Sequence, residues 1–301
     1  MEGLLRGTKG TADHQPRGGK NTCKTALFPL TEAFCKAGYE VSAFITAKRG
    51  DAEEVARERG ASHDLVVCCG GDGTLGEVIN GLQDVDHAVP LGYIPLGSTN
   101  DFASTLGLPK RLLQAIARVV EGEATPFDIG LWNDERYFSY IASFGAFTAS
   151  SYSASQSVKN VLGHFAYVLE GAKELASIRT YAVTVEADGT VLEGEYLFGA
   201  VSNSTTVGGM VKLNKELVDL HDGEFEVVLV KKPKGAGELS KLLLALKGGN
   251  FENRKLFDFF KASKISFTIE GNPPWSLDGD LAEAEGTIVI ENCHDALLLR
   301  L

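Results

Sequence analysis

The residues with the clearest chemical potential form one glycine-rich segment: Gly70, Gly71, Asp72, Gly73 and Thr74. An apolar run of strand length, 65–69, precedes it, and a helix-like pattern over 75–82 follows it. Glycine lets the backbone approach an anion, and the free N–H groups and dipole of a helix start favour negative charge. The Asp72 carboxylate suits a metal ligand or a proton acceptor better than phosphate contact. The segment therefore predicts a nucleoside triphosphate with Mg²⁺ and chemistry beside it.

A second group of small polar residues follows the next apolar run, 88–94: Ser98, Thr99, Asn100 and Asp101. The first segment alone is equally compatible with a plain tight turn from strand to helix. Two strand ends that each deliver glycine, a hydroxyl and an aspartate, however, fit neighbouring strands of a parallel sheet. In such sheets ligands bind at the carboxyl ends of the strands, so we expect both groups to meet there.

Alternating strand and helix patterns surround these two segments. The sequence predicts helices over 22–37, 51–59 and 110–121, and strands over 39–46, 65–69 and 88–94. This alternation predicts an α/β domain with an open parallel sheet over residues 20–125. Residues 1–19 are polar and glycine-rich, and we expect them to be poorly ordered.

The pattern changes after residue 125. Strand-like segments predict a second domain over 126–295, mainly an antiparallel β-sandwich, interrupted by a helix over 158–177. The expected strands cover 137–143, 181–187, 191–201, 225–231, 265–270 and 287–291. Asp188-Gly189 marks a hairpin turn between the second and third of these.

Composition narrows the classes of function. The chain has 301 residues and a net charge of −11, which argues against nucleic acid as the main partner. No apolar run approaches the ~20 residues that span a bilayer, and the N-terminus lacks the apolar core of a signal peptide. The five cysteines include no C-x-x-C pair, which favours reduced thiols in the cytoplasm.

The two polar segments together resemble the soluble lipid kinases with a diacylglycerol-kinase catalytic domain, most of all the bacterial diacylglycerol kinases, which are related to the sphingosine kinases. The resemblance continues through Phe127-Asp128-Ile129-Gly130 and Asp222-Gly223 to Leu277-Asp278-Gly279-Asp280, and covers roughly residues 20 to 301. It implies a fold like that of diacylglycerol and NAD kinases, in which strand 296–301 returns to the first domain. It also implies transfer of the γ-phosphoryl group of ATP to the hydroxyl of diacylglycerol or a related lipid alcohol, giving phosphatidic acid.

The resemblance also assigns roles to residues of this chain. Asp72 and Asp101 would hold Mg²⁺ or its water shell, and Asp280 matches the family's proton acceptor. The nucleotide would contact Thr46, Gly70, Gly71, Asp72, Gly73, Thr74, Ser98, Thr99 and Asn100. A second Mg²⁺ site would use Asp128, Asp219, Asp222 and Glu224, since oxygen ligands suit a hard cation. From local sequence alone, the last three read as a plain Asp-Gly turn before a strand.

Three departures from the family pattern bear on catalysis. Relatives usually carry Asn where this chain has Gly76, and Glu where it has Asp280, which is shorter by one methylene. They also begin with an apolar strand and an Asn-Pro-x-x-Gly turn, whereas residues 1–19 offer neither. Only Gly18-Gly19-Lys20 could be a remnant of that turn. These departures keep open a lipid- or nucleotide-binding relative that has lost catalysis.

An NAD kinase is a further alternative, since it shares the first segment; Gly97 to Ala103 argue against it. For the lipid kinase we expect peripheral contact with the inner face of the membrane. Residues 231–264 carry nine Lys/Arg and three Asp/Glu, which gives +6 and leaves −17 for the remainder of the chain. The alternative interpretation of this basic segment is a pair of solvated helices that pack their Leu and Phe side chains into the β domain. The sequence leaves acyl-chain preference and oligomeric state open, with a homodimer among the options.

Overall fold

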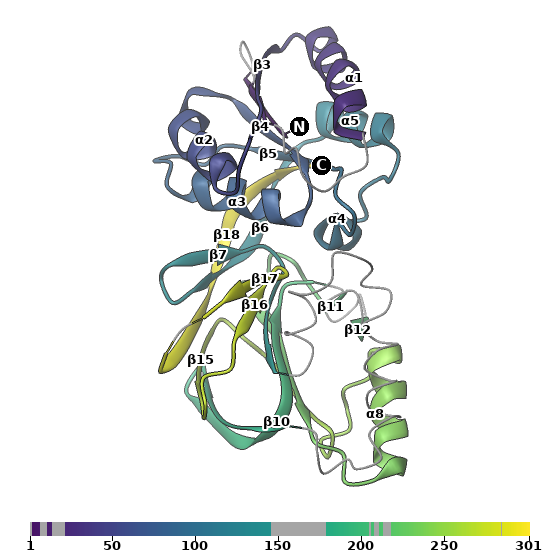
Figure 1. The fold of residues 1–301 in the computed structure, drawn as a ribbon, viewed down its shortest axis with the longest axis vertical. Coiled ribbons are helices and arrows are strands. Elements are labelled where there is room, and N and C mark those ends of the chain that lie inside the picture. Colours follow the sequence, from purple (N-terminus) through teal and green to yellow (C-terminus); the bar gives the residue numbers. More distant parts are fainter. Residues whose placement is uncertain are drawn as a thin grey trace. The chain divides into compact units, whose positions relative to one another are not determined.

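The computed structural model describes residues 2–6, 11–13, 22–145, 179–204, 206–207, 211–212, 218–283 and 285–301. Its contacts divide the chain into two compact units. The first comprises Met1–Ile129 and Asp295–Leu301, and the second comprises Gly130–His294. The ribbon in Figure 1 is coloured along the chain, so that both parts of the first unit can be followed.

Parallel strands form the centre of the first unit. Strand β4 (Leu65–Gly70) is buried along its whole length and pairs in parallel with β5 (Leu91–Pro95), with Gly70 opposite Pro95. The end of β18 (Thr287–Arg300) continues the sheet in parallel, since Leu299 lies opposite Leu91. Because both faces of these strands are covered, the sequence shows continuous apolar runs there instead of alternation. The predicted open α/β sheet is confirmed.

The N-terminal segment departs from expectation. We expected no first strand, but β1 (Glu2–Arg6) pairs antiparallel with β3 (Glu40–Phe44) and with β4. Strand β2 (Thr11–Asp13) adds a parallel bridge to β4. The apolar pair Leu4-Leu5 supplies the short strand, because its backbone groups find partners on both sides. The predicted glycine remnant, 18–20, lies outside the described residues.

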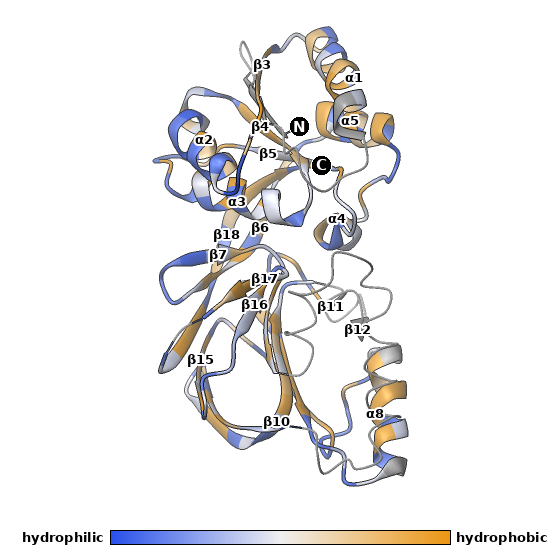
Figure 2. Cartoon of the chain, in the orientation of Figure 1, coloured by the Kyte–Doolittle hydropathy of each residue, from blue (hydrophilic) through white to orange (hydrophobic). Residues whose placement is uncertain are grey.

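Helices cover this sheet where the sequence predicts them: α1 (Thr22–Lys36), α2 (Asp51–Arg59), α3 (Asp72–Gln83) and α5 (Leu112–Glu121). The short helix α4 (Asp101–Thr105) was not predicted. Helix α2 is mostly hydrophilic and buries only Ala52 and Ala56 (Figure 2). It lies so close to α3 that a Cβ at Gly81 would approach the Glu53 carbonyl oxygen to 2.3 Å. Helix α3 begins at Asp72, three residues before the expected start.

The second unit is antiparallel. Its strands run β7 (Arg136–Phe138), β8 (Ile141–Gly145), β9 (Tyr181–Ala187), β10 (Thr190–Ser202), β13 (Phe225–Lys231), β14 (Phe257–Ala262), β15 (Lys264–Ile269), β16 (Trp275–Leu277) and β17 (Asp280–Ala282). β6 (Ala124–Trp132) and β18 run from one unit into the other. In its core, Phe267 makes edge-on contacts with Phe144 and Trp275, and the rings of Phe144 and Trp275 are tilted against each other. The β-rich architecture and the 188–189 hairpin are as predicted.

Three local predictions need comment. The expected strand over 137–143 is broken at Ser139-Tyr140, where backbone N–H groups turn to the Asp278 carboxylate. Within the basic segment, α8 (Ala236–Gly248) is a helix, but residues 257–262 form β14, so the prediction of a helix pair was wrong there. The pairing of β14 with β13 is continuous from Phe257 to Ala262, so its backbone is that of a strand. The predicted helix over 158–177 lies outside the described residues.

Candidate active site

Two glycines bring the polar segments together. Gly71 is the residue before α3, and Gly97 follows β5. A Cβ built on Gly97 would come within 2.5 Å of the Gly71 Cα, so only glycine permits this approach. The N–H groups of Leu96 and Gly97 both donate to the Gly70 carbonyl oxygen, at 2.8 and 3.2 Å. The two strand ends therefore form one surface, as the parallel pairing of β4 and β5 requires.

Asp72 ties the two segments to each other. Its Oδ2 accepts the backbone N–H of Asp101 at 3.0 Å, and its Oδ1 accepts that of Phe102 at 3.3 Å. These N–H groups open α4, so the carboxylate also faces the positive end of a short helix. Sequence reasoning missed this second task. Asp72 positions Asp101 in addition to offering its own charge.

The Asp72 carboxylate is also electrostatically strained. Burial raises its pKa to about 6, and the negative charge of Asp101 acts in the same direction. The backbone N–H groups that it accepts work against this rise but do not cancel it. Because the two carboxylates repel each other, a cation beside them would be favoured.

The other predicted nucleotide residues differ in exposure. Thr46 and Thr74 are buried, whereas Ser98 and Thr99 are exposed. The Thr74 hydroxyl, in the first turn of α3, has no hydrogen-bond partner among the described residues. Asn100 adopts a left-handed backbone (φ 54°), and its Nδ2 donates to the Gly97 carbonyl oxygen at 2.9 Å. Asn100 therefore shapes the second segment through its side-chain amide.

Glu77 of α3 is a residue that the sequence reasoning did not single out. Its Oε2 accepts the N–H of Ala52 at 3.3 Å and so ties α3 to the start of α2. Burial raises its pKa. Asp51, in the same corner, accepts the N–H groups of Ala47 and Lys48 through Oδ2, at 2.7 and 2.9 Å. These contacts fix the loop that carries Thr46. The contacts of Asp51 are local in sequence, whereas Glu77 lies 25 positions from Ala52, so its contact could not be predicted from the local pattern.

In the second unit, the hairpin turn of β16 and β17 holds two aspartates with different tasks. Asp278, at φ 50°, accepts four hydrogen bonds: from Ser139 N and Oγ, and from the N–H groups of Tyr140 and Ile141. Burial nevertheless raises its pKa to about 6. Asp280 is partly exposed, and its Oδ2 lies 2.9 Å from an Arg136 guanidinium nitrogen. Asp278 thus anchors the turn, and Arg136, which the sequence did not single out, orients Asp280.

The residues expected for a second metal site do not gather their side chains into a ligand group in the described structure. Asp222 Oδ2 lies 2.6 Å from the Lys261 ammonium, and its Oδ1 accepts the N–H of Glu224. Asp219 accepts the N–H of His221. Lys261 is also 3.2 Å from buried Glu226, whose pKa burial raises to about 7. A lysine already supplies positive charge at this loop, which the sequence could not show because Lys261 comes from β14.

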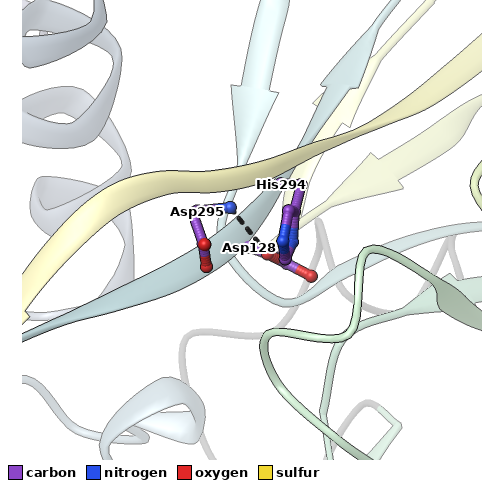
Figure 3. Close-up of side chains that lie close together, drawn as sticks. All are labelled: Asp128, His294 and Asp295. Atoms are coloured by element: carbon purple, nitrogen blue, oxygen red, sulfur yellow. Dashed lines mark hydrogen bonds between the residues drawn. The ribbon is translucent and has the colours of Figure 1, made fainter.

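Asp128, the fourth of those residues, belongs to a different group of side chains, although a Cβ built on Gly223 of the 219–224 loop would lie 3.6 Å from the His294 ring of that group. It is buried on β6, and its Oδ1 accepts the N–H of Asp295 at 2.8 Å (Figure 3). With His294, the neighbour of Asp295 in the chain, these side chains place ligand atoms within 4.8 Å of one another. Across the described residues this is the one group of three or more such side chains that could hold a metal ion. His294 and Asp295 carried no sequence signal.

No helix within the described part of the chain is long and apolar enough to cross a membrane.

Known proteins resemble this chain over most of its length. Residues 14–132 match the family model "Diacylglycerol kinase catalytic domain", and residues 142–295 match "YegS C-terminal NAD kinase beta sandwich-like domain". The chain is 36% identical over 269 residues to a diacylglycerol kinase of Bacillus subtilis, covering 89% of this chain and 88% of that protein. It is 34% identical to a diacylglycerol kinase of Staphylococcus saprophyticus, covering 89% and 87%.

Solved structures show the same fold. The structure of a diacylglycerol kinase from Bacillus anthracis matches with a TM-score of 0.74 at 22% identity, covering 98% of this chain and 97% of that one. An NAD kinase of Archaeoglobus fulgidus, in complex with ATP, matches with a TM-score of 0.54 at 14% identity, covering 98% and 94%. Both likenesses concern the arrangement of strands and helices.

Proposed function

The chain belongs to the diacylglycerol kinase family, and from that premise we propose that it transfers the γ-phosphoryl group of ATP to the free hydroxyl of diacylglycerol, giving phosphatidic acid. The observation that supports this most directly is the joined surface of Gly71 and Gly97, with the carboxylates of Asp72 and Asp101 beside it. The free backbone N–H groups at the start of a helix can donate hydrogen bonds to phosphate oxygens. The paired carboxylates suit the Mg²⁺ that accompanies them.

The residues present fit a nucleotide with its metal. The unpartnered hydroxyl of buried Thr74 offers a hydrogen bond in the first turn of α3, and a Cβ at Gly73 would meet nothing within 4 Å. When bound, Mg²⁺ neutralises phosphate charge during phosphoryl transfer. Asp72 and Asp101 would hold it, and the loop of Thr46 would contact the nucleotide. The segment 98–100 would line the same site.

Asp280 is proposed to accept the proton of the lipid hydroxyl. Arg136 holds the Asp280 carboxylate in one orientation, and Asp278 fixes the turn below it. A carboxylate positioned to accept a proton typically raises the reaction rate by about 10²–10⁴-fold. The lipid would be taken from a bilayer by peripheral contact at its inner face, with the β-rich unit determining acyl-chain preference.

The decisive experiment offers the purified protein radiolabelled ATP with Mg²⁺ and, in parallel, dispersed diacylglycerol, sphingosine or NAD. We expect label in the lipid extract only with diacylglycerol. Label in sphingosine or in NAD would replace the proposed acceptor. Absence of label from all three, in protein shown to bind ATP, would instead favour a binding relative that has lost catalysis.

A further inference from the structure

Helix α2 begins without a capping side chain at the residue before it. That residue, Gly50, has a left-handed backbone (φ 88°) and no side chain that could accept the free N–H groups of the first turn. Such N–H groups need an acceptor, which is commonly the side chain of the residue just before the helix. For α2 the acceptor comes from another helix. Glu77 of α3 accepts the N–H of Ala52 at 3.3 Å, although 25 positions separate the two residues.

The Glu77 carboxylate is half-buried where α3 meets the start of α2. Burial raises the pKa of Glu77, and hydrogen bonds from the backbone of Gly50 and of Ala52 act against this rise. The carboxylate therefore contacts the start of the helix at two residues. The dipole of α2 also favours a negative charge at this end. Glu77 thus takes the place of the cap that a glycine cannot supply.

The same face of α3 packs against α2 one turn further along. Gly81 follows Glu77 by four residues, so both lie on one face of the helix. A Cβ at Gly81 would approach the Glu53 carbonyl oxygen to 2.3 Å and the backbone nitrogen of Arg57 to 3.0 Å. Close packing at Gly81 determines how near the two helices lie. The hydrogen bonds of Glu77 determine where the first turn of α2 lies along α3.

A short loop connects Thr46 to this helix start. Asp51, the first residue of α2, accepts the N–H groups of Ala47 and Lys48 through Oδ2, at 2.7 and 2.9 Å. The loop is therefore folded back onto the first turn of α2, and its position follows that of the helix. A displacement of the start of α2 would move the buried Thr46 with it.

Both ends of this series of contacts belong to the proposed nucleotide site. Glu77 lies in the second turn of α3, and the first turn of that helix contains Asp72 and Thr74. The glycine-rich segment follows β4, and Thr46 follows β3, but β1 lies between β3 and β4 in the sheet. The sheet therefore joins the two segments through a third strand, whereas Glu77 joins their helices directly.

We propose that Glu77 is a positioning residue for the nucleotide: by capping α2 from α3, it holds the Thr46 loop in place beside the glycine-rich segment. The inference rests on the proposed function in so far as ATP contacts both of these segments. Glu77 acts through the backbone of another helix and does not touch ATP. Its loss should therefore weaken the binding of ATP and leave the transfer step from bound ATP nearly unchanged.

Two substitutions test this role. Glu77→Leu removes both acceptor oxygens, whereas Glu77→Gln keeps one acceptor oxygen and removes the charge. Calorimetric titration with ATP and Mg²⁺ should show affinity about tenfold weaker in Glu77→Leu and about threefold weaker in Glu77→Gln, because hydrogen bonds to a charged group are lost or weakened. In steady-state kinetics, KM for ATP should rise by the same factors, while kcat and KM for diacylglycerol stay within about twofold of wild type.

A matched control removes a charge from the same helix start without removing the hydrogen bond. Glu54 is exposed in the first turn of α2, and Glu54→Leu should bind ATP as wild type does. Equal weakening in Glu54→Leu and Glu77→Leu would overturn the proposal, because it would assign the effect to charge near the helix. Unchanged ATP affinity in Glu77→Leu would overturn it too, and so would a fall in kcat at unchanged KM for ATP.

Hydrogen–deuterium exchange follows the loop in the absence of nucleotide. Amides 47–52 should exchange faster in Glu77→Leu than in wild type or Glu54→Leu, because the Ala52 N–H loses its acceptor. Amides of α5 should exchange at the wild-type rate, which separates a local opening from a general loss of stability. Equal acceleration in α5 and in the loop would contradict a positioning role.

The same measurements separate the role of Glu77 from the chemistry. If wild type binds ATP but labels no lipid, the kinase proposal falls, and the ATP affinities of the variants still decide the role of Glu77. If wild type labels diacylglycerol while loop exchange and ATP affinity are unchanged in Glu77→Leu, the kinase proposal stands and the positioning role falls.

Discussion

At the scale of single residues, carboxylates of similar sequence context have different tasks. Asp72 accepts the N–H groups that open α4, Asp278 accepts four hydrogen bonds, and Asp280 pairs with an arginine. Burial raises the pKa of Asp72 and of Asp278 to about 6. Asp280 is partly exposed and forms an ion pair with Arg136. All three residues are aspartates, so the differences in their chemistry come from their surroundings.

Asp101→Asn should lower kcat by about a hundredfold or more, because it removes a carboxylate from the proposed metal site while keeping its size. Asp72→Asn should do the same. Steady-state kinetics with ATP and diacylglycerol measure this. Asp86→Asn, an exposed aspartate just beyond α3, is the control and should keep wild-type turnover. Retention of more than about a third of wild-type turnover by Asp101→Asn would show that Asp101 is not part of the site.

Asp280→Glu should retain or raise activity if Asp280 is a proton acceptor shortened by one methylene. Asp280→Asn should lower kcat by about 10²-fold or more without unfolding the protein. Kinetics of both variants with dispersed diacylglycerol give the answer. An undetectable rate in wild type and in the Asp280→Glu, Gly76→Asn double variant would indicate a protein that has abandoned catalysis.

The raised pKa of Asp278 predicts a pH dependence of stability. A carboxyl whose folded pKa lies near 6, against 3.8 unfolded, binds its proton more tightly in the folded state. Its stabilising contribution is complete below about pH 4 and declines as pH rises to about 6, by up to about 1.4 kcal/mol per pH unit. Urea unfolding of wild type and of Asp278→Asn from pH 4 to 8 should show wild type losing stability relative to the variant over that interval. A constant difference would mean that the folded pKa is not raised.

At the scale of elements, helix α3 shows how position decides what a glycine does. Gly76 lies on an open part of the helix, and a Cβ there would meet nothing within 4 Å. Gly81 lies against α2, where a Cβ would reach the Glu53 carbonyl oxygen. The sequence alone could not separate these two glycines, because the difference comes from a neighbouring helix.

Gly76→Ala should therefore raise the free energy of unfolding by about 0.5–1 kcal/mol, the usual gain from replacing glycine inside a helix. Gly81→Ala should lower it, because the added methyl group would push α2 away from α3. Urea denaturation of the two variants beside wild type measures both changes. A loss of stability in Gly76→Ala would show that the position needs glycine for a reason other than space.

At the scale of the whole molecule, strand β18 contributes residues to both units. Residues 287–291 of β18 pair with β15, and Leu299 and Arg300 pair with β5. The Arg300 guanidinium donates to the carbonyl oxygens of Gly122 and Val120, both at 2.9 Å. The last residues thus complete the first unit, although 165 residues of the other unit precede them in the chain.

Leu299→Ala should destabilise the first unit by about 2–5 kcal/mol, because Leu299 is fully buried beside β5. Leu298→Ala, one residue away and only partly buried, should cost less. Urea unfolding followed by limited proteolysis would show whether sites in residues 22–129 open first in the Leu299 variant. Equal losses in the two variants would contradict the expected contribution of the buried Leu299 side chain.

The sequence by itself determined most elements and the joining of two polar segments. Helices α1, α2 and α5 and strands β4, β9 and β13 follow its local patterns within a residue or two, because periodicity and glycine placement act over short distances. The resemblance carried by those segments gave the family. The prediction of these elements and the recognition of the family both depend on residues that are neighbours in the chain.

Only the tertiary structure decided which groups meet across distance. It paired Asp72 with the start of α4, Arg136 with Asp280, and Lys261 with Asp222. It also turned 257–262 into a strand, because pairing with β13 satisfies that segment's backbone groups. Such contacts join residues tens of positions apart. Local pattern carries no record of them, since their partners are chosen by packing and by the need to satisfy buried charge and backbone.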